Sequence, residues 1–299
     1  MIETRDGTVT RLKPRPNEDV NKFFICDYGR LNYRWINRTD RAELPLVRTE
    51  GTLRSIDWDV AIHAAASLIR DTRTFVLASP FLSNEALHLL SQVMRRKGGA
   101  GAFRVATGDE VPLPGVEDLA LRHDRAANVH GAELFGFARS ENPLSELREG
   151  DVLIVADDDL DGIEAEEIAR ASQVIIIGTT LPRAAAEAAV LLPITNFAEE
   201  EGTFTNLRGR VQRFAQAKPA PGLARPSWLV LGDLLGALGE QDSFYMPSDV
   251  FASIAQSHKA FSGLSYETLG MRGLPVLGQK ATTGSVGADG LGAGSGGAR

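Results

Sequence analysis

Short apolar runs alternate with amphipathic segments through the middle of the chain. Each run is too short for a buried helix and is rich in β-branched residues, which is typical of buried parallel strands. The runs occupy residues 74–78, 151–156, 173–178 and 190–193, with a further predicted strand at 103–107. Amphipathic helices are predicted at 55–70, 83–97, 162–171, 182–189, 226–238 and 249–261. Strands that alternate with helices predict an α/β fold, a parallel sheet flanked by helices with right-handed crossovers.

A hairpin is predicted directly after the last of these strands, over residues 201–214. Residues 203–205 favour a strand, 206–209 contain turn-forming Asn and Gly, and 211–214 return to strand-like alternation. Three arginines, Arg208, Arg210 and Arg213, surround this hairpin. In an acidic chain these arginines need an anionic neighbour. Three candidates stay open: a phosphate-bearing cofactor, the run of glutamates at 199–201, or carboxylates of a partner subunit.

The organisation along the chain follows from the same pattern. We expect a small β-rich segment at 1–54, an α/β domain with the hairpin at 55–240 and a helical extension at 241–280. Residues 281–299 are mainly Gly, Ala and Ser without aromatic residues. Such a segment has too little apolar surface to fold, so a disordered tail is predicted.

Charge and composition exclude several classes of function. The formal net charge is -7 and the pI is about 5.4, which disfavours a nucleic-acid surface. Cys26 is the one cysteine, so a disulfide or a self-contained zinc or iron-sulfur site is not expected. No window approaches the ~20 apolar residues of a membrane span, and no signal peptide is recognised, so we expect a reducing, cytoplasmic location without direct membrane insertion.

One acidic pattern and one group of histidines suggest metal ligands, but neither has the residue spacing that a metal site requires. Residues 157–162, D-D-D-L-D-G, imitate an EF-hand opening, but Ile168 stands where a bidentate glutamate is needed. We therefore expect these carboxylates at the N-terminus of a helix. His123 and His130, like His88, lack a ligand spacing and are expected to face solvent.

The carboxyl ends of the predicted strands define the expected ligand edge of the sheet. The residues there are Ser79, Asp157, 178–180 and 195–196. Asp157, Asp158 and Asp159 would repel a pyrophosphate at this edge. This charge argues against a dinucleotide ligand.

Three segments resemble the molybdopterin oxidoreductase superfamily. They are V-N-K-F-F-I-C-D-Y-G-R at 20–30, L-P-L-V-R at 44–48 and P-I-T-N-F-A-E-E-E-G-T-F-T-N-L-R-G-R-V-Q-R at 193–213. Within the superfamily the sequence is most similar to the large iron-sulfur subunit of respiratory NADH:quinone oxidoreductase. It resembles a shortened form of that subunit, without its cysteine-rich N-terminal region.

The resemblance implies a role for Cys26 that this sequence does not complete. Cys26 matches the last of four cysteine ligands to an iron-sulfur cluster, and the other three would precede residue 1. Another chain could supply them, the start could be misplaced, or the cluster could be lost. We expect loss, with Cys26 as a buried structural thiol and an orphan iron-sulfur ligand as the alternative.

The resemblance also implies a function. The expected protein is a subunit of an NADH:quinone oxidoreductase or related membrane-attached redox complex, a structural scaffold without catalytic residues or a redox centre. Iron-sulfur clusters and flavin are expected in partner subunits, which would hold it at the periphery of the inner membrane. The alternatives are an assembly factor, or a molybdopterin-dependent oxidoreductase or cofactor-binding fragment. In the last case Arg208, Arg210 and Thr179 are candidate cofactor-binding residues, because the corresponding edge in pterin-containing relatives faces guanine dinucleotide groups.

Overall fold

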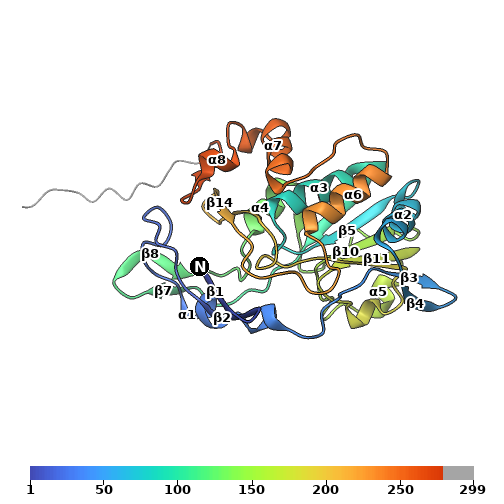
Figure 1. Cartoon of the computed structure of the whole chain (residues 1–299), viewed down its shortest axis with the longest axis horizontal. Helices are drawn as coiled ribbons and strands as arrows, with labels where there is room; N and C mark the ends of the chain where they lie inside the picture. The colour runs from blue at the N-terminus through green and yellow to red at the C-terminus, as the bar shows by residue number, and fades with distance from the viewer. Residues whose placement is uncertain (279–299) are drawn as a thin grey trace, which may run out of the picture.

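One eight-stranded sheet runs through the centre of the computed structural model, which describes residues 1–278 (Figure 1). The strands from β12 to β9 are parallel, whereas β3 and β4 join the sheet antiparallel. The α/β fold class and its parallel sheet are thus confirmed. The strand order is β4 (Thr52–Ser55), β3 (Leu46–Thr49), β12 (Val190–Pro193), β11 (Gln173–Gly178), β10 (Val152–Ala156), β5 (Thr74–Ala78), β6 (Ala100–Phe103) and β9 (Ala138–Arg139).

Two apolar cores form on the two faces of this sheet, because successive side chains of a strand point to opposite sides. In β5, Val76 belongs to the core beneath α2 (Trp58–Ile69), α3 (Asn84–Arg95) and α6 (Ser227–Ala237). Its neighbours Phe75 and Leu77 belong to the opposite core. Central strands that are buried on both faces explain the unbroken apolar runs of the sequence.

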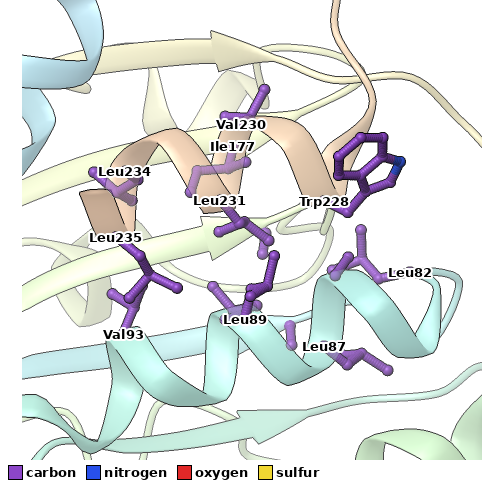
Figure 2. Packing of buried hydrophobic residues seen from close by; sticks show 14 of the residues in the cluster. Leu82, Leu87, Leu89, Val93, Ile177, Trp228, Val230, Leu231, Leu234 and Leu235 are labelled. Atoms are coloured by element: carbon purple, nitrogen blue, oxygen red, sulfur yellow. The ribbon is translucent and has the colours of Figure 1, made fainter. Parts of the chain in front are cut away.

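Helices α3 and α6 pack against each other over the sheet. Figure 2 shows Leu89 and Val93 of α3 beside Leu231 and Leu235 of α6, all buried. Helix α3 begins where the sequence predicts, since the Ser83 hydroxyl accepts a hydrogen bond from the Ala86 amide at 3.1 Å. The predicted helices at 55–70, 83–97 and 226–238 are confirmed, and each observed helix is one to three residues shorter at either end.

Two predicted helices are far shorter than expected. The segment 162–171 contains only α5 (Ala165–Ile168), and 182–189 contains only the 3-10 turn η3 (Arg183–Ala185). In the second crossover the carbonyls of Ala186 and Ala188 accept hydrogen bonds from the Arg48 guanidinium of β3, the second at 3.0 Å. These bonds tie the segment before β12 to the neighbouring strand β3.

The strand expected at 103–107 lies at 100–103 instead, as β6. Its glycines resemble a turn in the sequence, but they permit close packing beneath the end of α3. A Cβ added to Gly99 would lie 2.2 Å from the Met94 carbonyl oxygen, and one added to Gly101 would lie 2.6 Å from the Met94 sulfur. Tertiary packing, rather than local turn preference, selects glycine at these two positions.

Smaller sheets flank the large one. The predicted hairpin is confirmed as β13 (Gly202–Thr205) and β14 (Arg210–Phe214), joined by β15 (Leu274–Pro275). Further hairpins are β1 (Ile2–Arg5) with β2 (Thr8–Leu12), and β7 (Val111–Leu113) with β8 (Val116–Leu121).

The remaining helices are short or lie at the periphery of the molecule. They are α1 (Asp27–Leu31), η1 (Arg34–Asn37), η2 (Arg96–Gly98), α4 (Val129–Leu134), α7 (Pro247–Ser257), η4 (Lys259–Phe261) and α8 (Tyr266–Leu269). The predicted helix at 249–261 is thus divided into α7 and η4. No helix within residues 1–278 has the length and apolar character needed to cross a bilayer.

The predicted domain boundaries stay a prediction. Strands β3 and β4 link the expected segment 1–54 to the large sheet through β12. The tail predicted at 281–299 lies outside the described residues.

Truncation of the α3–α6 contact should destabilise the fold. Leu231 is 1% exposed, so we expect Leu231→Ala to lower the free energy of unfolding by about 2–5 kcal/mol through lost burial and a residual cavity. Denaturant unfolding measures this. Leu207→Ala is the control, because Leu207 is 64% exposed and should change stability by less than about 0.5 kcal/mol. Equal effects of the two changes would contradict this packing.

Candidate functional site

A cavity of about 560 Å³ lies at the carboxyl ends of β5, β6, β10 and β11. This is the edge at which open α/β sheets bind ligands. Of the residues expected there, Ser79, Asp157, Thr179 and Thr180 line the cavity. Thr195 and Asn196 are buried outside its lining. Residues from the N-terminal region, Tyr28 and Trp35 among them, form the opposite wall.

Asp157 turns the chain at the end of β10. Its backbone has a φ of 57°, and its carboxylate accepts hydrogen bonds from the Thr179 amide at 2.8 Å and the Thr179 hydroxyl at 2.7 Å. Loss of surrounding water raises the pKa of Asp157 above its ordinary value, against the opposing effect of these bonds. Asp157 thereby ties the ends of β10 and β11 together.

The neighbouring carboxylates are held by Arg104. Its guanidinium binds both carboxylate oxygens of Asp158, at 2.7 and 3.0 Å, and also Asp159 at 2.7 Å. The expected placement of this acidic run at a helix N-terminus is wrong, because Glu164 is the residue that precedes and caps α5. The run fails to start the helix because Arg104 and the strand end fix its geometry.

Two of the three arginines that line the cavity form ion pairs with carboxylates of the chain. Arg38 pairs with Asp40, with both nitrogen-oxygen distances at 2.6 Å, and Arg104 is paired as described. Arg125 differs: its guanidinium lies 5.4 Å from the centroid of the Tyr28 ring, and its Nη1 atom is buried without a hydrogen-bond partner.

These donors decide which groups the cavity can accept. A pyrophosphate needs several uncommitted cationic or N–H donors, whereas here the Arg38 and Arg104 guanidinium groups are each paired with carboxylates of the chain. The carboxylates of the lining therefore oppose the pyrophosphate of a pterin dinucleotide, as the sequence predicts. Arg125 is the lining arginine whose Nη1 atom is buried without a hydrogen-bond partner.

The arginines of the hairpin lie outside this cavity. Arg213 pairs with Glu201 at 2.7 Å, which confirms the internal-pairing alternative for this residue. Arg210 instead binds the Gly273 carbonyl at 2.7 Å and Asp19 at 3.2 Å, and the Arg208 amide donates to the Asn206 side chain. The structure does not bring Arg208 and Arg210 together with Thr179, and their role as cofactor ligands stays a prediction.

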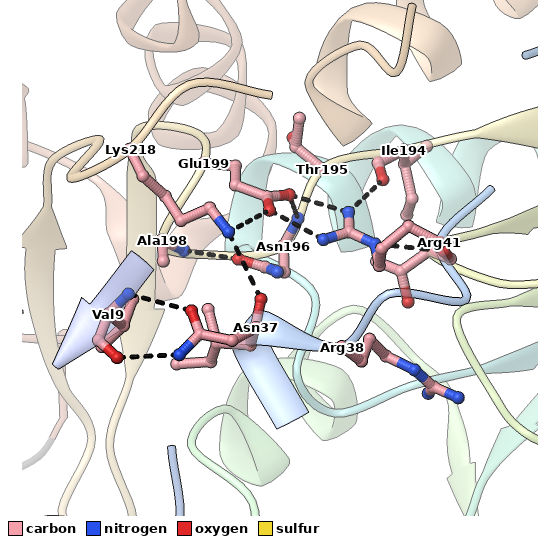
Figure 3. A network of polar contacts seen from close by, with 12 residues as sticks. Val9, Asn37, Arg38, Arg41, Ile194, Thr195, Asn196, Ala198, Glu199 and Lys218 are labelled. Atoms are coloured by element: carbon pink, nitrogen blue, oxygen red, sulfur yellow. Dashed lines mark hydrogen bonds and ion pairs between the residues drawn. The ribbon is translucent and has the colours of Figure 1, made fainter. Parts of the chain in front are cut away.

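The first glutamate of the hairpin segment anchors the N-terminal region to the sheet. Figure 3 shows Glu199 facing Arg41 and Lys218. Arg41 donates to both Glu199 oxygens at 2.7 Å and to the Ile194 carbonyl at 3.3 Å. Both side chains of this pair are buried, at 4% and 0% exposure. Arg41 thus closes a polar network that sequence analysis missed, because its partner lies 158 residues away.

The next glutamate, Glu200, joins the hairpin to α6. Its carboxylate accepts hydrogen bonds from the Thr195 hydroxyl at 2.8 Å, the Ser227 amide at 2.7 Å and the Ser227 hydroxyl at 2.8 Å. Burial raises the pKa of Glu200 to about 7, since all of these donors are neutral. A carboxylate at a helix N-terminus also complements the helix dipole.

A second buried carboxylate, Glu85 of α3, binds the hairpin from the other side. It accepts hydrogen bonds from the Thr203 amide, the Thr203 hydroxyl and the Tyr266 hydroxyl, each at 2.9 Å. Burial raises the pKa of Glu85 to about 7 as well. Burial and the Glu85 carboxyl together raise the pKa of Tyr266. Glu85 therefore connects α3, β13 and α8.

Cys26 does not occupy the buried position expected for a structural thiol. It is exposed, and its sulfur accepts a hydrogen bond from the Gly29 amide at 3.3 Å at the start of α1. The expectation fails because α1 buries none of its residues. No group of three or more His, Cys, Asp or Glu within the described chain could hold a metal ion, and one thiol does not fit a cluster that takes four ligands.

The histidine expectation is wrong at one position. His88 is 2% exposed and lies 5.4 Å from the ring of His258, with its Nδ1 atom lacking a hydrogen-bond partner. Burial lowers the pKa of His88 to about 4, helped by His258. His88 is therefore a neutral core residue, whereas His123 is exposed.

Comparison with known proteins shows what part of this chain is similar to. Residues 126–237 match the molybdopterin oxidoreductase family model. The chain is 30% identical over 204 residues to the putative formate dehydrogenase YrhE of Bacillus subtilis, which covers 60% of this chain and 21% of that protein. It is 37% identical over 128 residues to the F420-dependent formate dehydrogenase 2 subunit alpha of Methanococcus maripaludis, which covers 42% and 19%.

A further similarity is to an NADH-quinone oxidoreductase subunit from Pseudomonas fluorescens, with 34% identity over 90 residues, or 30% of this chain and 10% of that protein. The chain spans at most about a fifth of the length of these three relatives.

Loss of the Arg41 guanidinium should destabilise the protein strongly. Arg41→Met leaves Glu199 buried without its main partner, which should cost about 3–5 kcal/mol in the free energy of unfolding. Arg38→Met is the matched control, because the Arg38–Asp40 pair is solvent-exposed and should contribute less than about 1 kcal/mol. Denaturant unfolding of both variants checks the difference, and similar losses would refute the anchoring role of Arg41.

Glu85 should make stability depend on pH. Its pKa rises from an ordinary 4.5 to about 7 on folding, so its contribution is complete below pH 4.5 and is lost as the pH rises through 7. Glu85→Gln mimics the protonated acid and should remove about 3 kcal/mol of this decline at most. Unfolding measured from pH 4.5 to 8 tests this, with Glu166→Gln, at an exposed site, as the control. An unchanged slope in Glu85→Gln would disprove the assignment.

Proposed function

We propose that this chain, which belongs to the molybdopterin oxidoreductase superfamily, is a structural subunit of an NADH:quinone oxidoreductase or a related membrane-attached redox complex. In this role it has no catalytic residue or redox centre of its own. Flavin and iron-sulfur clusters lie in partner subunits. Those partners hold the chain at the cytoplasmic side of the membrane.

The observation that carries this proposal is that arginines near the sheet edge and in the hairpin form ion pairs with carboxylates of the same chain. Arg104 and Arg38 at the sheet edge are paired with carboxylates, and so are Arg210 and Arg213 of the hairpin. Groups that would hold a phosphate-bearing cofactor are used here to stabilise the chain itself. The similarity to NADH-quinone oxidoreductase subunits of two Pseudomonas species supports the assignment to this kind of complex.

A second candidate is a molybdopterin-dependent oxidoreductase or a cofactor-binding fragment. The similarity to formate dehydrogenases favours it, as does the buried, unpartnered Nη1 atom of Arg125 in the cavity. Under this candidate Arg125 would hold an anionic group of the cofactor, and Arg125→Ala would lower the metal content of the purified protein.

Purification from the native organism separates the two candidates. We expect the tagged full chain to co-purify with flavin- and iron-sulfur-containing subunits that together reduce quinone with NADH. Metal analysis of the same preparation, together with its visible absorption, should assign its iron and flavin to the partners. Molybdenum and tungsten should be far below one atom per chain.

The outcomes are distinct. Stoichiometric molybdenum or tungsten that falls in Arg125→Ala would overturn the structural role and support the second candidate. A chain that purifies alone, without redox subunits or metal, would overturn both.

A further inference from the structure

A groove of about 1020 Å³ lies among segments that do not belong to the eight-stranded sheet. Four parts of the chain form it: the N-terminal region up to Tyr28, the β7–β8 hairpin, β14 with the residues that follow it, and Met271 after α8. In Figure 1 the β7–β8 hairpin extends from the body of the molecule beside β1 and α1. An isolated two-stranded hairpin has little stability of its own in water, so its apolar side chains need a further layer.

The groove exposes large apolar side chains from several segments. Phe24 is 43% exposed, Tyr28 42%, Val111 54% and Met271 71%. Single exposed apolar residues are ordinary, but a contiguous group around a groove marks an interaction surface. Aromatic residues, Met and Arg are the types enriched in the centres of protein interfaces.

The charges of the groove are unlike those of the chain as a whole. The chain has a net charge of -7, yet the side chains that line the groove include Lys13, Arg15 and Arg213 against the carboxylate of Asp27. Lys13 and Arg213 are already paired, with Glu3 and Glu201. Arg15 has no carboxylate partner in the described chain, and its guanidinium makes a long contact of 3.5 Å with the Arg213 carbonyl oxygen.

A half-buried guanidinium without an anion, at the edge of an apolar groove, is complementary to one kind of occupant. We infer that this groove docks a segment of a partner subunit in which apolar side chains flank an aspartate or glutamate that pairs with Arg15. The inference rests on the proposed function and deepens it by naming the surface through which the chain joins the complex.

The chemistry of the groove favours a protein segment over the other occupants. A second copy of the same groove would add another Lys13, Arg15 and Arg213 against one further carboxylate, Asp27, so positive charge would stay in excess. A bilayer would need a broad convex surface, whereas here the apolar side chains line a concavity between separate segments.

Site-specific photocrosslinking in the full chain tests the inference. Benzoylphenylalanine at Phe24 places the probe in the groove, and the same probe at Tyr245 is the matched control. Tyr245 is 84% exposed and lines a different cavity, beside α2 and α6. In the purified complex we expect the probe at Phe24, but not at Tyr245, to crosslink an acidic, apolar peptide of a redox subunit.

Charge reversal at Arg15 completes the test. Arg15→Glu should lower the yield of this crosslink by about tenfold or more, and Arg15→Lys should retain most of it. Both variants should keep the wild-type thermal midpoint, because the contact of Arg15 within the chain is weak.

Crosslinking only to a second copy or to lipid, or an intact complex without any crosslink at Phe24, would overturn the groove assignment while the proposed function stands. Equal crosslinking in Arg15→Glu would overturn the role of Arg15. A chain that binds no redox subunit at all would overturn the proposed function and this inference with it.

Discussion

The structure depends on carboxylates that are buried at the junction between the sheet and the hairpin. Glu199 binds Arg41 from the N-terminal region, Glu200 binds the start of α6, and Glu85 of α3 binds β13 and Tyr266. A buried carboxylate is costly unless its oxygens are fully hydrogen-bonded. The segments that supply these donors must therefore dock together, which specifies one arrangement of parts that are distant in the sequence.

This arrangement gives the string of residues at 199–213 a structural meaning within this chain. The threonines of the string, together with Glu199 and Glu200, face inward to α3, α6 and the N-terminal region. The Arg213 guanidinium lies 4.4 Å from the centroid of the Tyr266 ring. The same residues that carry the family resemblance thus hold the domain together. Their presence indicates the fold more directly than it indicates a reaction.

Sequence analysis predicted the elements whose pattern is local. The strands at 74–78 and 173–178 have the predicted bounds, since runs buried on both faces are apolar at nearly every position. The hairpin followed from its turn residues. Elements set by distant contacts were missed or misplaced. Gly99 and Gly101 lie at a strand because α3 is close above them, and the segment predicted as a helix at 182–189 is bound to Arg48 of β3. For the candidate site, Asp157 and Thr179 were predicted from strand ends. Arg104, Arg125 and Glu85 were not, since nothing in the sequence near them indicates their partners.

The pairing of β12 with β3 also constrains how the chain folds during synthesis. Leu46 and Val47 pair with Leu191 and Val190, and α6 covers the sheet only after both strands exist. The ribosome must therefore synthesise the chain as far as β12 before β3 can pair with it. Until then the apolar side chains of β3 have no neighbouring strand. Contacts this distant in sequence slow folding and lengthen the exposure of aggregation-prone segments. Nascent chains of this protein should accordingly require chaperones more than a helical bundle of equal length would.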